Sequence, residues 1–194
     1  MADYVALADK YARDVVAGTI PAAKWTRMAC KRSIKDAKRK KWQYAFDAAA
    51  ASRVCGILEK FRHIKGEWAN RKETLQLEPW QCWITCQVFG WKNAKGLRRY
   101  RTAYIEVPRK NAKSTFSSAL GLYMLTADGE QGSEVYSAAK SKKQALIVFQ
   151  DAQEMARRDA NFRGMFGAHV GAHAIYVPGT ASKFEAVAAE ADAP

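Results

Sequence analysis

The sequence predicts an α/β protein in which an N-terminal layer of helices is followed by a parallel sheet. Apolar residues recur at helical spacing through most of the first 70 residues, as they do in amphipathic helices. Beyond residue 70, strand-like and helix-like segments alternate, which is typical of a parallel sheet with crossover helices. A basic loop ending in Lys113 and Ser114 separates one of these strands from the next helix. We therefore expect two parts, residues 1–70 and residues 71–194.

Composition narrows the class of protein. The 194 residues include 32 Lys and Arg against 19 Asp and Glu, a formal net charge of +13, and 48% are hydrophobic. This hydrophobic fraction argues against intrinsic disorder. No apolar run approaches the ~18 residues of a membrane span, and the N-terminus lacks the basic and then apolar order of a signal peptide. The charge predicts a polyanionic partner, nucleic acid or nucleotide, although a solvated basic surface would have the same composition.

The four cysteines predict buried free thiols in a reducing compartment. Four are too few for a disulfide scaffold in a chain of this size. Cys82 and Cys86 are four residues apart, which places both on one face of a helix. A zinc site would need further Cys or His nearby, and the nearest histidine in the sequence is His63.

Three helices are expected in the first part, over about residues 4–16, 22–41 and 44–61. The second ends in the basic run Lys38–Lys41. Such a run is more often a solvated helix end than a DNA contact, and both interpretations stay open here.

The second part predicts an ordered alternation of elements. Pro79 precedes an amphipathic run, as Pro does in the first turn of a helix, and Ser141 is a preferred helix N-cap. The first two long strands should be parallel neighbours, because a strand–helix–strand crossover joins them. The expected elements are strand 75–77, helix 80–89, loop 90–96, strand 102–107, helix 113–126, strand 134–139, helix 141–155, strand 174–177 and strand 184–187.

Residues 107–115, which read Val-Pro-Arg-Lys-Asn-Ala-Lys-Ser-Thr, are the most informative stretch. A phosphate-binding loop lies between a strand and a helix, where backbone N–H groups and the helix N-terminus converge on an anion. It also needs a Lys for the β- and γ-phosphates of ATP and a Ser or Thr hydroxyl for Mg²⁺. Lys113 and Ser114 meet these two requirements.

The glycines of such a loop are absent. Val107 and Ala112 occupy the two positions where the general pattern has glycine. If the position of Ala112 is left-handed, alanine costs roughly 1–2 kcal/mol there, which puts turnover in doubt more than the fold. The alternative is a basic turn that caps a helix, with Asn111 or Ser114 as the capping residue.

Residues Arg109–Ser114 nevertheless resemble the deviant Walker A motif of the large terminase subunit of tailed phages. The flanks are similar too, as are four segments outside the loop: Lys65–Ala69, Leu77–Gln81, Glu134–Ala139 and Gln144–Ala145. The resemblance implies a RecA/ASCE-like P-loop ATPase domain over residues 71–194, after a helical segment over residues 1–70.

The resemblance also implies roles for individual residues. Gln81 would contact the adenine, although it could instead be a helix-surface glutamine beside a core tryptophan. Arg109 would act as a cis arginine finger on the γ-phosphate, although it could instead contact DNA or solvent. Lys113 would be catalytic together with Arg109, and Ser114 would hold Mg²⁺. The nucleotide would be surrounded by Gln81 and the loop residues Arg109, Lys110, Asn111, Ala112, Lys113, Ser114 and Thr115.

Residues Ser182–Asp192 resemble the stretch before the Walker B strand of that family. No run of four apolar residues followed by Asp-Glu occurs after Lys113. We therefore expect an N-terminal fragment that is not catalytically complete, without the C-terminal endonuclease domain. One face of its sheet should then lack a cover, because parallel sheets are normally buried on both faces.

The function implied by the resemblance is ATP-driven packaging of double-stranded viral DNA in the cytoplasm of a bacterial host. The cofactors would be ATP and Mg²⁺. The partners would be double-stranded DNA, the portal protein, the small terminase subunit and other copies of the parent protein in a ring, with no membrane. Two alternatives remain: a fragment of a helicase-like or RecA-like ATPase, and a non-enzymatic basic DNA-binding module made of the N-terminal helices.

Overall fold

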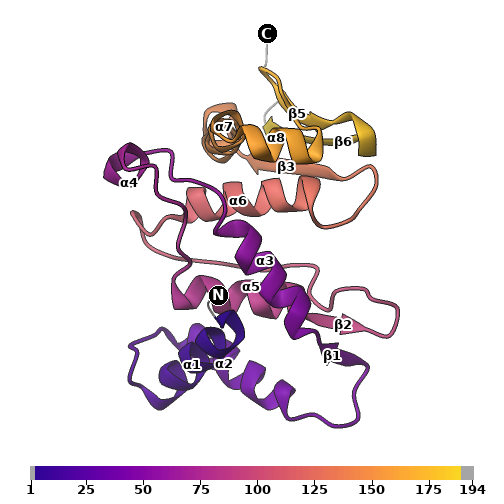
Figure 1. The fold of residues 1–194 in the computed structure, drawn as a ribbon. Helices are drawn as coiled ribbons and strands as arrows, with labels where there is room; N and C mark the ends of the chain where they lie inside the picture. The colour runs from indigo at the N-terminus through magenta and orange to yellow at the C-terminus, as the bar shows by residue number, and fades with distance from the viewer. Residues whose placement is uncertain (1–2, 189–194) are drawn as a thin grey trace. The chain divides into compact units, whose positions relative to one another are not determined.

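A computed structural model describes residues 3–188 and divides the chain into two compact units (Figure 1). The first unit comprises Met1–Ile57 and Gln76–Glu106, and the second comprises Leu58–Leu75 and Val107–Pro194. The predicted division of the sequence at residues 70 and 71 stays a prediction. No helix of the described residues is long and apolar enough to cross a membrane.

The first unit is mainly helical. Helix α1 begins after Asp3, whose carboxylate accepts a hydrogen bond from Ala6 N at 2.9 Å, and ends at Gly18, which has a left-handed φ of +86°. Helix α5 begins with Pro79 and a capping box between Glu78 and Gln81. The elements of this unit are α1 (Tyr4–Ala17), α2 (Lys24–Ala37), β1 (Tyr44–Phe46), α3 (Ala48–Leu58), α5 (Pro79–Gly90) and β2 (Trp91–Asn93).

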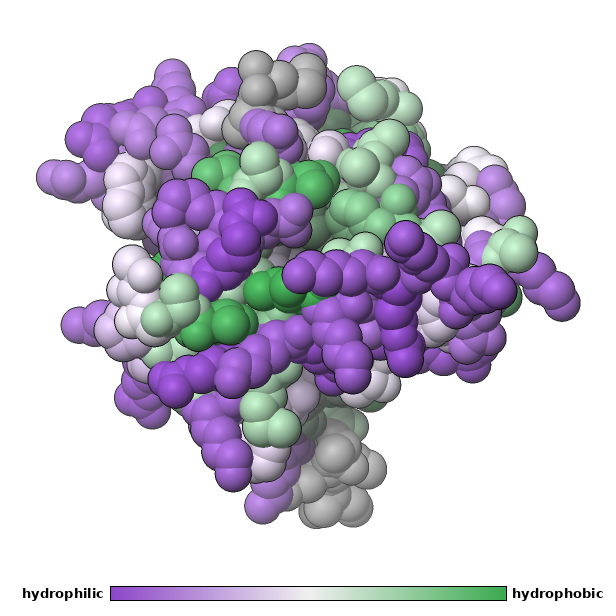
Figure 2. Space-filling model, turned by 90° about the horizontal axis from the view of Figure 1, so that it is seen from below, coloured by the Kyte–Doolittle hydropathy of each residue, from purple (hydrophilic) through white to green (hydrophobic). Residues whose placement is uncertain are grey.

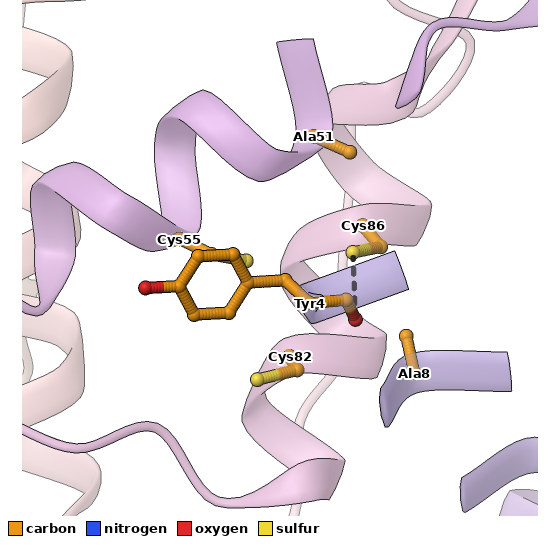
Figure 3. Packing of buried hydrophobic residues seen from close by; sticks show 6 residues of the cluster. All are labelled: Tyr4, Ala8, Ala51, Cys55, Cys82 and Cys86. Carbon is orange, nitrogen blue, oxygen red and sulfur yellow. Dashed lines mark hydrogen bonds between the residues drawn. The ribbon is translucent and has the colours of Figure 1, made fainter. Parts of the chain in front are cut away.

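Small side chains form a tightly packed core in this unit (Figure 3). Cys86 Sγ lies 3.9 Å from the carbonyl oxygen of Tyr4, which ties α5 to α1. All four cysteines are free and buried, so the prediction of buried thiols is confirmed. Burial raises the pKa of the Cys30 thiol to about 11, and a protonated thiol is a poor nucleophile. The cluster consists of Tyr4, Ala8, Ala51, Cys55, Cys82 and Cys86.

The helix predicted over 44–61 is wrong at its start. Strand β1 (Tyr44–Phe46) pairs antiparallel with β2, in the segment that was predicted to be a loop. Aromatic side chains at alternate positions favour a strand there. Asp47 then caps α3, because its Oδ1 accepts from Ala50 N at 2.9 Å. A side chain on Gly90 would put its Cβ 2.4 Å from the Phe46 ring.

The second unit contains a four-stranded sheet in the order β3-β6-β5-β4. Strands β3 and β6 are parallel, with Glu134 opposite Lys183, whereas β5 is antiparallel to both of its neighbours. The elements of this unit are α4 (Gly66–Asn70), α6 (Lys113–Thr126), β3 (Glu134–Ala139), α7 (Lys142–Arg158), α8 (Ala160–Phe166), β4 (His169–Val170), β5 (Ala174–Val177), η1 (Pro178–Thr180) and β6 (Ser182–Ala188).

Phe184 of β6 packs against two helices on one face of this sheet. A Cβ added to Gly121 of α6 would lie only 2.6 Å from the Phe184 ring, so α6 approaches the ring closely at this glycine. The ring centroid is 5.5 Å from that of Phe149 of α7, edge to face. The Ser137 hydroxyl also donates to Ala145 O at 2.7 Å, which joins β3 to α7. Because Phe184 touches both helices, α6 and α7 cover the same face.

The other face of the sheet stays open among the described residues. Tyr136, Tyr176 and Val187 are 46%, 45% and 42% exposed. The register places Tyr176 opposite Lys183, whose ammonium lies 2.8 Å from Glu185. That hydrogen bond raises the pKa of Lys183 above its ordinary value. The expectation that the sheet lacks a cover because the chain is a fragment stays a prediction.

Two predicted strands are absent. Residues 102–107 pair with no strand of the described chain, and β3 pairs with β6 instead, so the predicted parallel pair of 102–107 and 134–139 is wrong. Tyr104 is 88% exposed. A β-prone sequence becomes a strand only where a neighbour accepts and donates its backbone hydrogen bonds. Residues 75–77 are likewise irregular, although Leu75 N donates to Phe61 O at 2.7 Å.

The sheet is mixed, with one parallel and two antiparallel pairings. Four residues separate β5 from β6, and three separate β4 from β5. Parallel neighbours need a crossover of about a dozen residues or more, whereas short turns join antiparallel strands. The short connections therefore force β4, β5 and β6 into an antiparallel meander, and only β3 and β6 are parallel.

We predict that Gly121→Ala lowers the free energy of unfolding. Overpacking against Phe184 costs about 1–3 kcal/mol, which exceeds the gain in helix propensity of up to ~1 kcal/mol. The matched control is Gly164→Ala in α8, where an added Cβ meets no atom within 4 Å. Thermal unfolding of both variants checks this, and a rise in the melting temperature of both would contradict the packing at Gly121.

Candidate phosphate-binding loop

Helix α6 presents an open N-terminus to the loop that precedes it. Its N-cap, Ala112, has a left-handed backbone (φ +51°, ψ +23°) and makes no side-chain cap hydrogen bond. The N–H groups in the first turn of a helix have no acceptor within the helix, and the helix dipole makes this end positive. The end of this 14-residue helix is therefore suited to an anion.

The loop itself is folded back on its own start. The ammonium of Lys113 donates to Val107 O at 2.7 Å, which bridges the two ends of the loop. Asn111 Nδ2 lies 3.2 Å from both Pro108 O and Arg109 O. These bonds hold residues 107–113 as one compact turn.

The turn carries three cationic side chains. Arg109, Lys110 and Lys113 are exposed, and none forms an ion pair with any residue between 3 and 188. Lys110 also has a left-handed φ of +68°. The loop therefore concentrates uncompensated positive charge next to the positive end of α6.

Ser114 and Thr115 occupy the first turn of α6, and both are half-buried. The helix behind them is anchored by Ser118, whose Oγ lies 2.7 Å from Ser114 O and 2.8 Å from Val148 O of α7. The first turn is thus fixed by packing, while its outer side meets the loop.

Gln81 lies in the first unit, whereas residues 109–115 lie in the second. The side chain is buried, and its Oε1 accepts from Glu78 N at 2.9 Å as part of the capping box of α5. Sequence reasoning missed this local structural role, although the spacing of Glu78 and Gln81 is that of a capping box. The assignment of Gln81 to the adenine stays a prediction.

Comparison with known proteins identifies the family. The family model described as the ATPase domain of the terminase large subunit matches residues 79–192, more than half of the chain. The chain belongs to this terminase family. The loop before α6 lies within the matched range, as do Glu134–Ala139 and Gln144–Ala145, whereas Lys65–Ala69 lies before it. Ala189–Asp192, at the end of that range, are outside the described residues.

A solved structure supports the fold of this terminase domain. The large terminase of bacteriophage HK97 matches with a TM-score of 0.60 at 22% sequence identity. The match covers 74% of this chain and 28% of that chain, so the chain spans well under a third of that terminase. No curated protein sequence matches the chain.

The structure also joins residues whose interaction the sequence did not reveal. Lys65 donates to the buried carboxylate of Asp151 at 2.5 Å, which holds the segment before α4 against α7. Lys65 opens one of the segments that resemble terminases, but its partner is 86 residues away. Only the tertiary fold could supply that pairing.

The first unit contains a cavity that is unrelated to the predicted site residues. Its volume is about 440 Å³, and none of the residues predicted to bind nucleotide lines it. The lining includes Trp42, Tyr44, Trp91, Arg39 and Lys40.

We predict that Ala112→Gly raises the free energy of unfolding by about 0.5–1 kcal/mol. Glycine relieves the strain of a left-handed alanine, roughly 1–2 kcal/mol. Glycine also gives the unfolded chain more conformational entropy, which offsets about 0.4–1 kcal/mol of that gain. Ala49→Gly, at an exposed position of α3, should instead lower it by up to ~1 kcal/mol. Urea denaturation compares the two, and equal destabilisation would mean that Ala112 is not strained.

Proposed function

We propose that the loop over residues 107–115 binds the phosphates of Mg·ATP and that this ATPase domain serves a DNA-packaging motor. The observation that carries the proposal is the bridge from the Lys113 ammonium to Val107 O beside the uncapped N-terminus of α6. A lysine held across this turn, next to the positive end of α6, is already close to the place that a β- or γ-phosphate would take. Membership of the terminase ATPase family supports the choice of ATP.

Each loop residue would make a different contribution to binding the phosphates. Lys113 would exchange Val107 O for phosphate oxygens, because a charge-assisted hydrogen bond is stronger than one to a neutral carbonyl. Arg109, exposed and without an ion pair among residues 3–188, would stabilise charge on the γ-phosphate as a cis arginine finger. The backbone and side chains of Lys110, Asn111, Ala112 and Thr115 would complete the nest.

Mg²⁺ would be held mainly by the nucleotide. The Ser114 hydroxyl would be the ligand from the first turn of α6. No group of three or more His, Cys, Asp or Glu among residues 3–188 is placed to hold a metal. Mg²⁺ usually keeps several waters and binds through substrate phosphates with few protein ligands. When bound, the ion would neutralise charge on the phosphates, and the Ser114 hydroxyl would help to hold it.

Gln81 would contact the adenine. A glutamine carboxamide can both donate and accept, and it pairs with adenine N6 and N7 in two places. The hydrogen bond from Glu78 N to Gln81 Oε1 fixes one end of this side chain. If Gln81 contacts the adenine, Gln81→Leu should weaken binding of ATP more than binding of GTP. Equal losses for the two nucleotides would mean that the residue acts only as a capping group.

The parent protein would translocate double-stranded viral DNA into a procapsid in the cytoplasm of the bacterial host. Its helical segment over residues 1–70 would precede the ATPase domain over residues 71–194. Its partners would be the DNA, the portal protein, the small terminase subunit and further copies in a ring, and a C-terminal endonuclease domain would cut the DNA. The terminase family match supports these assignments. The chain of residues 1–194 by itself would bind ATP without completing its hydrolysis.

We expect Lys113→Ala to weaken binding of a non-hydrolysable ATP analogue by about 10- to 100-fold. The substitution removes a charge-assisted hydrogen bond worth about 1.5–3 kcal/mol. Isothermal titration calorimetry in the presence of Mg²⁺ measures the affinity. The control is Lys60→Ala, which removes an exposed lysine of the same unit.

Equal affinity for Lys113→Ala and the unsubstituted protein would mean that this loop is not the phosphate site. Equal losses for Lys113→Ala and Lys60→Ala would mean that only net charge matters. A phosphate-release assay run in parallel tests whether the chain alone turns ATP over.

A further inference from the structure

The positive charge of the chain is concentrated in the first unit. Residues 1–57 and 76–106 contain 17 Lys and Arg against 7 Asp and Glu, a net charge of +10. Residues 58–75 and 107–194 contain 15 against 12, a net charge of +3. The unit with the phosphate-binding loop is therefore almost balanced. A partner that needs the charge would bind the helical unit.

Helix α2 gathers much of this charge on one face. Lys24, Lys31 and Lys35 are exposed and follow the i, i+7, i+11 spacing that keeps side chains on one stripe of a helix. Arg27 and Arg32, also exposed, flank the stripe. With the run that follows α2, the segment 24–41 contains nine basic residues and one acidic residue.

The one acidic residue does not neutralise this face. Asp36 is 5% exposed, and its Oδ2 accepts from Arg99 at 2.7 Å. Lys31 and Lys35 form no ion pair with any residue between 3 and 188. The lysine stripe therefore meets solvent with its full charge.

The apolar face of α2 is already occupied. Cys30 is fully buried with Ala12 and Val15 of α1, and Ile34 packs against the same cluster. A helix that lies on a membrane surface needs a free apolar face, and α2 offers only the exposed side chains of Trp25 and Met28 among its cations. Figure 2, viewed from the side where Figure 1 draws α1 and α2, shows mostly hydrophilic side chains with small apolar patches between them.

We propose that the stripe of Lys24, Lys31 and Lys35 on α2 binds the sugar–phosphate backbone of a nucleic acid duplex. Eleven residues of helix span about 16 Å, and each strand of a duplex carries one phosphate per about 3.4 Å of axis, so the stripe is long enough to meet more than one phosphate. The contact is electrostatic and independent of base sequence. The inference rests on the proposed function only for the choice of DNA as the duplex.

The test measures how binding of a fluorescein-labelled 20-base-pair duplex DNA depends on salt. Each phosphate contact contributes about 0.9 to the slope of log K against log salt concentration. The variant Lys24→Gln/Lys31→Gln/Lys35→Gln should therefore lower that slope by about 2–3 and weaken binding at least tenfold at low salt. Fluorescence anisotropy of the full chain reports both quantities.

The matched control removes the same charge from the second unit. Lys60→Gln/Lys143→Gln/Arg157→Gln changes three exposed residues there and should leave the salt slope within about 0.5 of the unsubstituted protein. Equal changes in the two triple variants would overturn the proposal, because the net charge alone would then set the affinity. An unchanged slope in the α2 variant would overturn it as well.

Two further measurements separate the outcomes. Sedimentation with vesicles of phosphatidylcholine and phosphatidylserine tests the membrane alternative, and loss of vesicle binding in the α2 variant without loss of DNA binding would overturn the proposal. Calorimetry with the ATP analogue should give the same affinity for the α2 variant and the unsubstituted protein. Failure of Lys113→Ala to affect ATP would count against the proposed function and leave the DNA result standing.

Discussion

The arrangement of the helices on the sheet of the second unit depends on the packing of Phe184 against α6 and α7. A ring on the buried face of β6 lies directly against Gly121 and meets Phe149 edge to face. Glycine is required at that point of α6 because any side chain would occupy the space of the ring. The close approach fixes the axis of α6 on the sheet, and the axis in turn sets where the N-terminus of the helix opens.

The candidate phosphate-binding loop follows from that placement. Left-handed Ala112 turns the chain into α6 without a capping side chain, and Lys113 reaches back to Val107 O. An uncapped helix end and strained alanine both cost stability. Proteins retain such costs mainly at functional sites, where the strain serves binding. The exposed Arg109 and Lys110 add charge at the same place, so the local chemistry of the loop is directed at an anion.

The two units differ in charge and in exposed surface. The second unit has a nearly balanced charge and an open sheet face with exposed Tyr136, Tyr176 and Val187. The first unit has a small-residue core built around Tyr4 and three cysteines, and it carries most of the excess positive charge. The excess positive charge of the first unit and the open helix N-terminus of the second are separate properties, since different residues produce each of them.

The sequence by itself determined the elements whose signals are local. The bounds of α6 and β3 match the predicted segments, and Ser141 caps α7 as expected, because periodicity and capping act within a few residues. The loop motif was also visible in the sequence, since it depends on the order of Lys113 and Ser114 between other elements. The terminase resemblance rested on the same residues and agrees with the family match.

Only the tertiary structure decided which β-prone segments became strands. Residues 102–107 have strand-like composition but no partner among residues 3–188, whereas Tyr44–Phe46 found one in β2. Backbone pairing is a long-range property, and a single segment carries no information about its neighbour. The same reason explains why the Lys65–Asp151 pair, the left-handed backbone at Ala112 and the bond from Lys113 to Val107 could not be derived from spacing. Each depends on where packing brings distant or strained groups together.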